Sequence, residues 1–171
     1  DLYWSAPHQA EPAIAAWWPR LFAAAVARDN EPLDPTRVLY ADLINTAGGR
    51  LTQAALLAIE VRSQPGEPIE PALLPALETA VAAPGRQGAM ARGALVFAAG
   101  FVLTIAGQQV TPALEGALAG DDEQGVALRR VLVVSSRVSM LASRTFSAPI
   151  LRGLVELRAA TLSSPTPRPR V

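Results

Sequence analysis

Proline and glycine divide this sequence into short apolar segments, and that division most constrains what the chain can fold into. The 171 residues include 15 prolines and 12 glycines. Most prolines stand where a helix would begin, and they are tolerated there because the missing N–H has no partner in a first helical turn. The pattern predicts short helices opening at Glu11-Pro12, Asp34-Pro35, Glu70-Pro71, Thr111-Pro112 and Ser147-Ala148-Pro149.

Apolar residues within these segments recur at helical spacing, which places them on one face of each expected helix. A further helix is expected over residues 123–142, with Asp121 or Asp122 as its N-cap. It contains the β-branched run Val131–Val134, which we assign to helix because no second strand-like run exists to pair with it. The one-face sets are Leu39, Tyr40, Leu43, Ile44 and Ala47; Leu73, Leu74, Leu77 and Val81; and Leu151, Leu154, Val155 and Leu162.

Glycine and proline also predict where helices stop. Gly48-Gly49 is expected to end one helix and form a tight corner, and Pro84-Gly85 to end another. Pro19 predicts a kink or a split in the first helix. The uncharged stretch 93–107, with glycine at every seventh position, is expected to form one central helix that others approach closely. It is shorter than the roughly 20 residues that a membrane span needs.

The expected architecture is all-α. Alternating helices joined by short turns favour irregular stacked hairpins of the HEAT type, although no fixed-period motif of the ankyrin or tetratricopeptide kind is apparent. An ordinary globular multi-helix bundle is the alternative. We expect an N-terminal extension over 1–10, one helical domain over 11–162, and a disordered tail or linker over the Pro/Ser/Arg-rich residues 163–171.

The composition leaves little catalytic equipment. The chain has no Cys, no Lys and a single His, and its 15 basic residues balance its 15 acidic ones. Disulfides, thiol catalysis, zinc ribbons and a Walker A loop are therefore excluded, and nothing in the net charge favours nucleic acid or an anionic membrane. His8 lies before the first expected helix, and the sequence contains no Gly-x-Ser-x-Gly motif whose serine it could activate. The acidic run Asp121–Glu123 fits a helix N-terminus better than a metal site. We expect no enzyme activity, cofactor or metal within this chain.

Two groups of residues are candidates for contact with a partner. Trp17 and Trp18 point in different directions on a helix, so that one can join the core while the other packs on a neighbour, and tryptophan is a common interface anchor. Arg130, Arg137 and Arg144 are spaced by seven and could line one helix face as an anion groove. Against that groove, residues 147–149 should break the helix, so a solvated or interface stripe is the preferred interpretation.

The segment Ile44-Asn45-Thr46-Ala47-Gly48-Gly49-Arg50-Leu51 resembles an Ile-Asn-x-x-x-Gly-x-Leu motif in the C-terminal helical region of bacterial sirtuin-domain anti-phage defence proteins. The likeness extends over about residues 36–157. Thr46-Ala47 replaces the family's His-Pro, and Gln108-Gln109 stands where a Trp is usual. The resemblance implies a sensing or assembly region without the NAD-consuming domain, whose Asn/His pair has no counterpart here.

Together these observations predict a non-catalytic helical scaffold or interaction module in the bacterial cytoplasm, which binds a protein partner or other domains of a larger chain. The alternative is a small all-α ligand-binding protein or enzyme with a pocket around 93–107. A membrane-associated bundle built on the same stretch is a third reading. The oligomeric state is left open.

Overall fold

The computed structural model describes residues 7–28, 45–62, 74–135 and 139–163, and every regular element among them is a helix. The all-α prediction is confirmed, and Val131–Val134 lies in a helix. The elements are α2 (Pro7–Arg28), α4 (Ala47–Arg62), α5 (Leu74–Ala82), α6 (Gly85–Phe97), α7 (Ala99–Ala119), α8 (Glu123–Val134), α9 (Met140–Thr145) and α10 (Ser147–Ser163). Two expected segments lie outside these ranges. They are the helix after Asp34-Pro35, with its apolar face up to Ile44, and the tail from residue 164.

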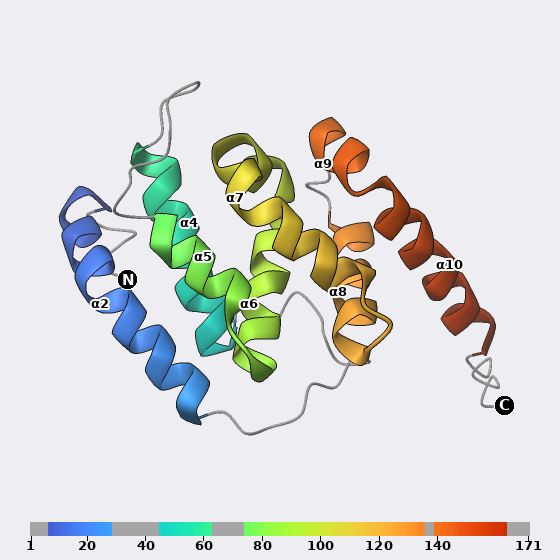
Figure 1. Cartoon of the computed structure of the whole chain (residues 1–171), viewed down its shortest axis with the longest axis horizontal. Helices are drawn as coiled ribbons and strands as arrows, with labels where there is room; N and C mark the ends of the chain where they lie inside the picture. Colours follow the sequence, from blue (N-terminus) through green and yellow to red (C-terminus); the bar gives the residue numbers. More distant parts are fainter. Residues whose placement is uncertain (1–6, 29–44, 63–73, 136–138, 164–171) are drawn as a thin grey trace, which may run out of the picture.

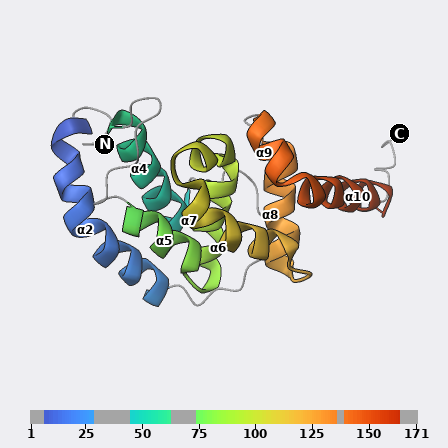
Figure 2. The same cartoon turned by 45° about the horizontal axis from the view of Figure 1, so that its top comes forward.

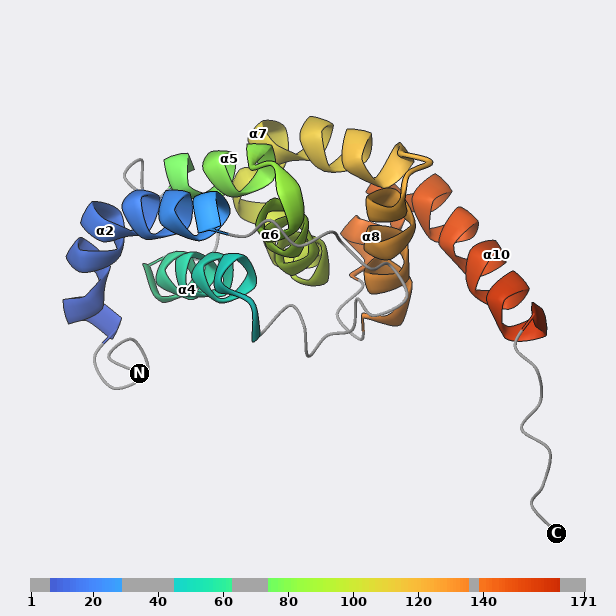
Figure 3. The same ribbon diagram turned by 90° about the horizontal axis from the view of Figure 1, so that it is seen from below.

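The helices follow one another across the molecule from α2 at one end to α10 at the other (Figure 1) and form an arc of two layers. Seen from below, the outer layer runs α2, α5, α7 and α10, and the inner layer runs α4, α6 and α8 (Figure 3). Neighbours within each layer are in contact, and α5 contacts α6 while α7 contacts α8. Figure 2 shows the last helix, α10, extending away from the end of the arc. The apolar core therefore lies between the two layers and continues along the arc.

Helix α6 is the centre of this arrangement, because it is surrounded on every side. Every residue from Gln87 to Val96 is buried. A helix that is buried on all sides lies inside the protein, and its polar side chains Gln87 and Arg92 make hydrogen bonds to neighbouring helices and helix ends. Small side chains such as Ala91 and Ala94, both buried, allow the helices α4, α5 and α8 to approach it closely.

The prediction of one continuous helix over 93–107 is wrong. Helix α6 ends at Phe97, and the axis turns by 91° before the first part of α7, residues 99–107. Ala98 makes the turn with φ −95° and ψ 20°, while its carbonyl oxygen accepts hydrogen bonds from the N–H groups of Phe101 and Val102. The glycines at 93, 100 and 107 are consequently divided between two helices. Among the described helices, none is by itself long and apolar enough to cross a membrane, and only this bent pair meets that test jointly.

Several expected helix ends also differ. Helix α7 continues through Thr111-Pro112, and its break lies upstream at Ala106, where φ is −139°. Pro112 has no N–H for the carbonyl of Gln108, which weakens the helix in the turn after that break. Helix α2 begins at Pro7 rather than at Pro12 and continues past Pro19; Figure 3 shows a bend near its start.

The prediction of Asp122 as the N-cap of α8 is confirmed, since its Oδ1 accepts a hydrogen bond from the N–H of Gly125 at 2.8 Å. The helix ends at Val134, however, and not at residue 142 as expected. The opening of α10 at Ser147 and the end of α5 just before Pro84-Gly85 are confirmed. Gly85 has a φ of +66°, which favours glycine and allows the sharp turn into α6.

Gly48 and Gly49 lie within the first turn of α4 and do not themselves end a helix. The helix expected before them falls on residues outside the description. The N–H of Gly48 donates to Gln87 Oε1 of α6 at 2.5 Å, and a Cβ at Gly48 would collide with the Gln87 carbonyl. The lack of a side chain at Gly48 therefore allows α4 to cross close to α6. This need for glycine arises from tertiary packing and not from the local sequence.

Gly125 and Gly116 provide a matched pair for testing this packing. A Cβ at Gly125 would collide with the Gly120 carbonyl, whereas a Cβ at Gly116 meets nothing within 4 Å. We expect Gly125→Ala to lower the free energy of unfolding by about 1–3 kcal/mol through overpacking. Gly116→Ala should raise it by about 0.5–1 kcal/mol, because alanine favours an exposed helix interior. Urea unfolding measures both, and equal effects would contradict the close approach at Gly125.

Candidate functional site

Trp18 is a core residue. Its side chain is buried, and its ring stacks on that of Phe22 with centroids 4.6 Å apart. The indole Nε1 donates to the Leu51 carbonyl oxygen of α4 at 2.6 Å. The indole hydrogen bond therefore joins α2 to α4, while the stack of Trp18 on Phe22 lies within α2.

Trp17 faces the other way and is 57% exposed. Leu21, one helical turn further on, is also exposed, and the Arg20 guanidinium carbon lies 5.7 Å from the centroid of the Trp17 ring. The two tryptophans thus point in different directions, as the sequence indicates. Contact of Trp17 with a partner stays a prediction.

The expected arginine stripe does not form on one helix. Arg130 is half-buried on α8, which ends at Val134, and Arg144 is exposed on α9. Arg137 lies outside the described residues. Because the helix ends before residue 137, the spacing of seven cannot align these three residues along a single face.

The arginine with the most developed contacts is Arg129, whose side chain is 0% exposed. Its Nη1 donates to the carbonyl oxygens of Leu118 at 2.6 Å and Gly120 at 2.7 Å, at the end of α7. Its Nε and Nη2 donate to the Glu156 carboxylate of α10, with the closest pair 2.6 Å apart. One guanidinium on α8 therefore ties α7 and α10 together.

A second arginine extends this network at the surface. Arg152 of α10 contacts Asp121, Glu156 and the Ala119 carbonyl oxygen. Hydrogen bonding from Arg129 lowers the pKa of Glu156, against the opposing effect of partial burial, and hydrogen bonding from Arg152 lowers the pKa of Asp121. Asp121 thus holds the α7–α8 corner to α10 as an ion-pair partner, whereas Asp122 caps α8.

Arg92 of α6 repeats half of the Arg129 arrangement. Its Nη1 donates to the carbonyl oxygens of Val81 at 2.9 Å and Ala83 at 2.6 Å, at the end of α5. Its buried Nε has no hydrogen-bond partner among the described residues. Burial lowers the pKa of Arg92, and the nearby Asp122 carboxylate partly opposes that effect.

Arg92 and Arg129 were not identified as structural residues from the sequence, although a signal exists. Residues 87–96 read Gln-Gly-x-x-x-Arg-x-x-Leu-Val, and residues 124–133 read the same, 37 positions further on. Pro-Ala-Leu-Glu likewise occurs at 75–78 and at 112–115. In both copies the arginine donates to carbonyls 11 and 9 residues earlier, and the glycine lies against the carbonyl five residues earlier.

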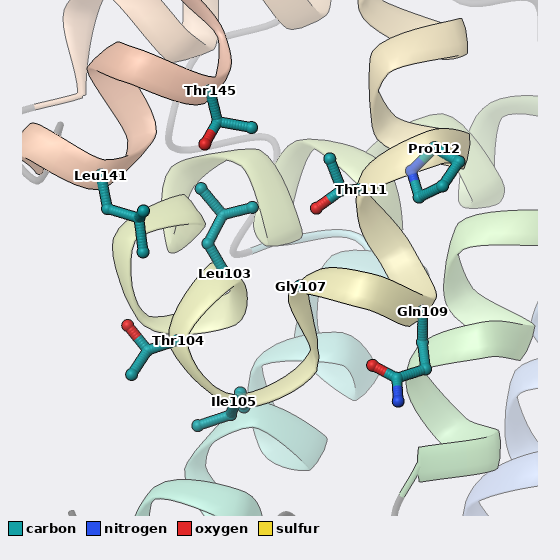
Figure 4. Close-up of a pocket in the computed structure, with 9 residues that line it drawn as sticks. All are labelled: Leu103, Thr104, Ile105, Gly107, Gln109, Thr111, Pro112, Leu141 and Thr145. Atoms are coloured by element: carbon teal, nitrogen blue, oxygen red, sulfur yellow. The ribbon is translucent and has the colours of Figure 1, made fainter. Parts of the chain in front are cut away.

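An open groove of about 660 Å³ lies between the kinked part of α7 and α9 (Figure 4). It overlaps the end of the 93–107 stretch, where the sequence suggests a pocket. Its polar groups are the hydroxyls of Thr104, Thr111 and Thr145 and the amide of Gln109, among apolar side chains from both helices. Its described lining contains no ionisable group, so it offers neutral hydrogen bonding and apolar contact.

The described residues bring together no group of three or more His, Cys, Asp or Glu that could hold a metal ion. The side chain of His8 lies outside the description. The charged groups that do meet, around Arg129, are engaged with one another and with helix ends. The best-defined polar cluster in this part of the chain therefore joins helices.

Replacing Glu156 with Gln tests the Arg129 tie. Because the pKa of Glu156 is lowered in the folded state, its stabilising contribution is present above the ordinary carboxyl range and is lost as the pH falls through the folded pKa. We expect Glu156→Gln to lower the free energy of unfolding at pH 7 by about 1–3 kcal/mol and to flatten its decline below about pH 4. Urea unfolding from pH 7 to pH 3 measures both effects.

The control for this experiment is Glu115→Gln, at an exposed position of α7. It should leave both the stability at pH 7 and its pH dependence close to those of the wild type. A Glu156→Gln variant with the wild-type pH profile would show that the ion pair does not stabilise the fold.

No protein-family model matches the sequence, and comparison with curated proteins and with solved structures yields no match. The resemblance to sirtuin-associated defence proteins stays a hypothesis. The described residues offer the exposed Trp17 face, the Arg129 tie and the groove between α7 and α9 as candidate functional features.

Proposed function

We propose that this chain is a non-catalytic helical-repeat scaffold, of the HEAT-like kind, that presents surfaces to a protein partner. The observation that carries the proposal is the shared pattern at 75–96 and 112–133 together with the matching contacts of Arg92 and Arg129. Units that stack on their neighbours and share one continuous core are typical of solenoids, whose extended surfaces bind proteins.

On this proposal the repeating unit has 37 residues. The first unit is 75–111 and the second is 112–148, and Pro149 opens a third, since Pro75, Pro112 and Pro149 share this spacing. Each complete unit supplies an outer helix, an inner helix and a short connecting helix. The two-layer arc in Figure 3 supports this division.

The partner surface that we propose is the exposed face of α2, formed by Trp17, Arg20 and Leu21. A large aromatic side chain beside an apolar one and an arginine has the composition of an interface hot spot. The resemblance to the helical region of anti-phage defence proteins suggests, as the biological role, sensing or assembly within a bacterial cytoplasmic defence system.

Binding of a small ligand in the α7–α9 groove is a second candidate function. Its support is the groove itself, with threonine hydroxyls and an amide placed among apolar side chains. The neutral side chains of its described lining suit an uncharged amphipathic molecule, and among them is no acid or base to drive a reaction.

The unit boundaries can be tested by duplication. A second copy of residues 75–111 inserted after Thr111 should add one unit, because each unit contacts only its neighbours. We expect helical content to rise in proportion, and a single melting transition no lower than that of the wild type. Circular dichroism measures both. An insert of 75–105 is the control, since it places the following helix out of step. An aggregated or molten product from the full insert would contradict the 37-residue unit.

The interaction role can be tested with Trp17→Ala. We expect loss of cross-linked protein partners by tenfold or more, with Tm unchanged because the side chain is exposed. Trp18→Ala should instead lower stability by about 3–5 kcal/mol. Quantitative in-cell cross-linking and thermal melting are the measurements, and Glu115→Ala is the surface control.

If Trp17→Ala retains every partner while staying folded, the α2 surface is wrong. If the chain holds no protein at all and a small molecule co-purifies with it, the groove becomes the better explanation of function.

A further inference from the structure

Helix α10 has two opposite faces, and among the described residues only one of them packs on other helices. The packed face contains the buried Gly153, where a Cβ would come within 2.9 Å of Val133 Cγ2 and 3.1 Å of the Arg129 carbonyl oxygen. Glu156, on the same side, pairs with Arg129. This face fixes α10 against α8.

The opposite face is apolar and exposed. Leu151 is 65% exposed, Val155 69% and Leu162 77%. With Arg158 they are spaced by four, three and four residues, which is the spacing of a helix-pairing seam. We call Leu151, Val155, Arg158 and Leu162 the α10 seam; Leu154, also exposed, lies beside it.

In the earlier outer helices α5 and α7, residues at positions corresponding to this face are buried. Leu77 of α5 and Leu114 of α7 correspond to Leu151 by the 37-residue spacing, and both are 0% exposed. Leu118, which corresponds to Val155, is equally buried. In α5 and α7 these positions belong to the apolar core, whereas in α10 no described helix lies over them. Helix α10 packs on α8 through Gly153 instead, although the corresponding Gly116 of α7 is exposed. The apolar positions of α10 are therefore left on its outward face.

We propose that the α10 seam pairs with the α10 seam of a second copy of this chain, antiparallel across a two-fold axis. The seam is self-complementary in that direction. Leu151 of one copy lies beside Leu162 of the other, and Val155 lies beside the aliphatic stem of Arg158, whose guanidinium reaches solvent. A two-fold arrangement uses the same surface on both copies and closes as a dimer.

The size of the seam sets the strength of this dimer. A 17-residue helix is about 25 Å long. Pairing two such helices buries on the order of 1,000 Å² in total, which is at the lower end of specific interfaces. The dimer is therefore reversible and dependent on concentration, and the polar Arg158 fixes its alignment at some cost in affinity.

This pairing rests on the proposed scaffold function and names one partner, the chain itself. Sedimentation equilibrium of the full chain, over two decades of concentration centred on ~10 μM, measures its molar mass and so tests for the dimer. The wild type should shift from monomer to dimer. Val155→Arg should weaken dimerisation by tenfold or more without changing Tm, because Val155 is exposed. Ala113→Arg introduces the same charge at an exposed position of α7, and this variant should dimerise like the wild type.

Cysteine cross-linking tests the direction of pairing, because the chain contains no cysteine of its own. A mixture of Leu151→Cys and Leu162→Cys chains should form a mixed disulfide on oxidation, and Leu151→Cys alone should not. A wild type that stays monomeric at every concentration, a dimer that survives Val155→Arg, or Leu151→Cys chains that link to one another would each overturn the proposal. A monomer that still binds a protein through Trp17 would overturn this pairing and leave the scaffold proposal standing.

Discussion

The buried guanidinium of Arg129 connects three helices, and the second half of the arc depends on it. A cation with no exposure to water is tolerated only when charged or dipolar acceptors surround it. Here two carbonyl oxygens at the end of α7, where the helix dipole is negative, and the Glu156 carboxylate of α10 provide them. The directions of α7, α8 and α10 are thereby set by one side chain whose donors have fixed geometry.

Close backbone approach is the second condition of the fold. Gly88 and Gly125 each lie against a carbonyl five residues earlier, at the corner where an outer helix turns into an inner one. The arginine four residues after each glycine donates to that same carbonyl. The small residue and the cation thus act on one corner, which explains why they recur together along the chain.

The sequence carries the fold class and several helix starts, because these depend on local chemistry. An aspartate before a helix favours an N-cap, as at Asp122, and proline is best tolerated in a first helical turn, as at Pro149. The breaks at Ala98 and Ala106 could not be predicted, since alanine carries no signal for leaving the helical conformation. The role of Gly48 could not be predicted for a related reason: its N–H and its lack of a side chain serve the contact with α6, which exists only in the folded structure.

In the candidate site, too, the sequence does not determine which of two adjacent side chains is buried. Adjacent residues on a helix differ in direction by about 100°, so Trp17 and Trp18 must differ in exposure, but spacing does not say which one is buried. Arg129 and Arg130 pose the same question. Comparison with Arg92, 37 positions earlier in an equivalent pattern, could have singled out Arg129.

The two arginine corners differ in one respect that has a mechanical consequence. Arg129 holds a carboxylate from the next outer helix, whereas the position equivalent to Glu156 in the preceding unit is Ala119, and Arg92 Nε makes no hydrogen bond within the described chain. The joint at α6 therefore lacks the cross-brace that stiffens the joint at α8. Under load the arc should flex first at its middle, and its curvature, and with it the spacing between the α2 and α10 ends, would be adjustable at that single joint.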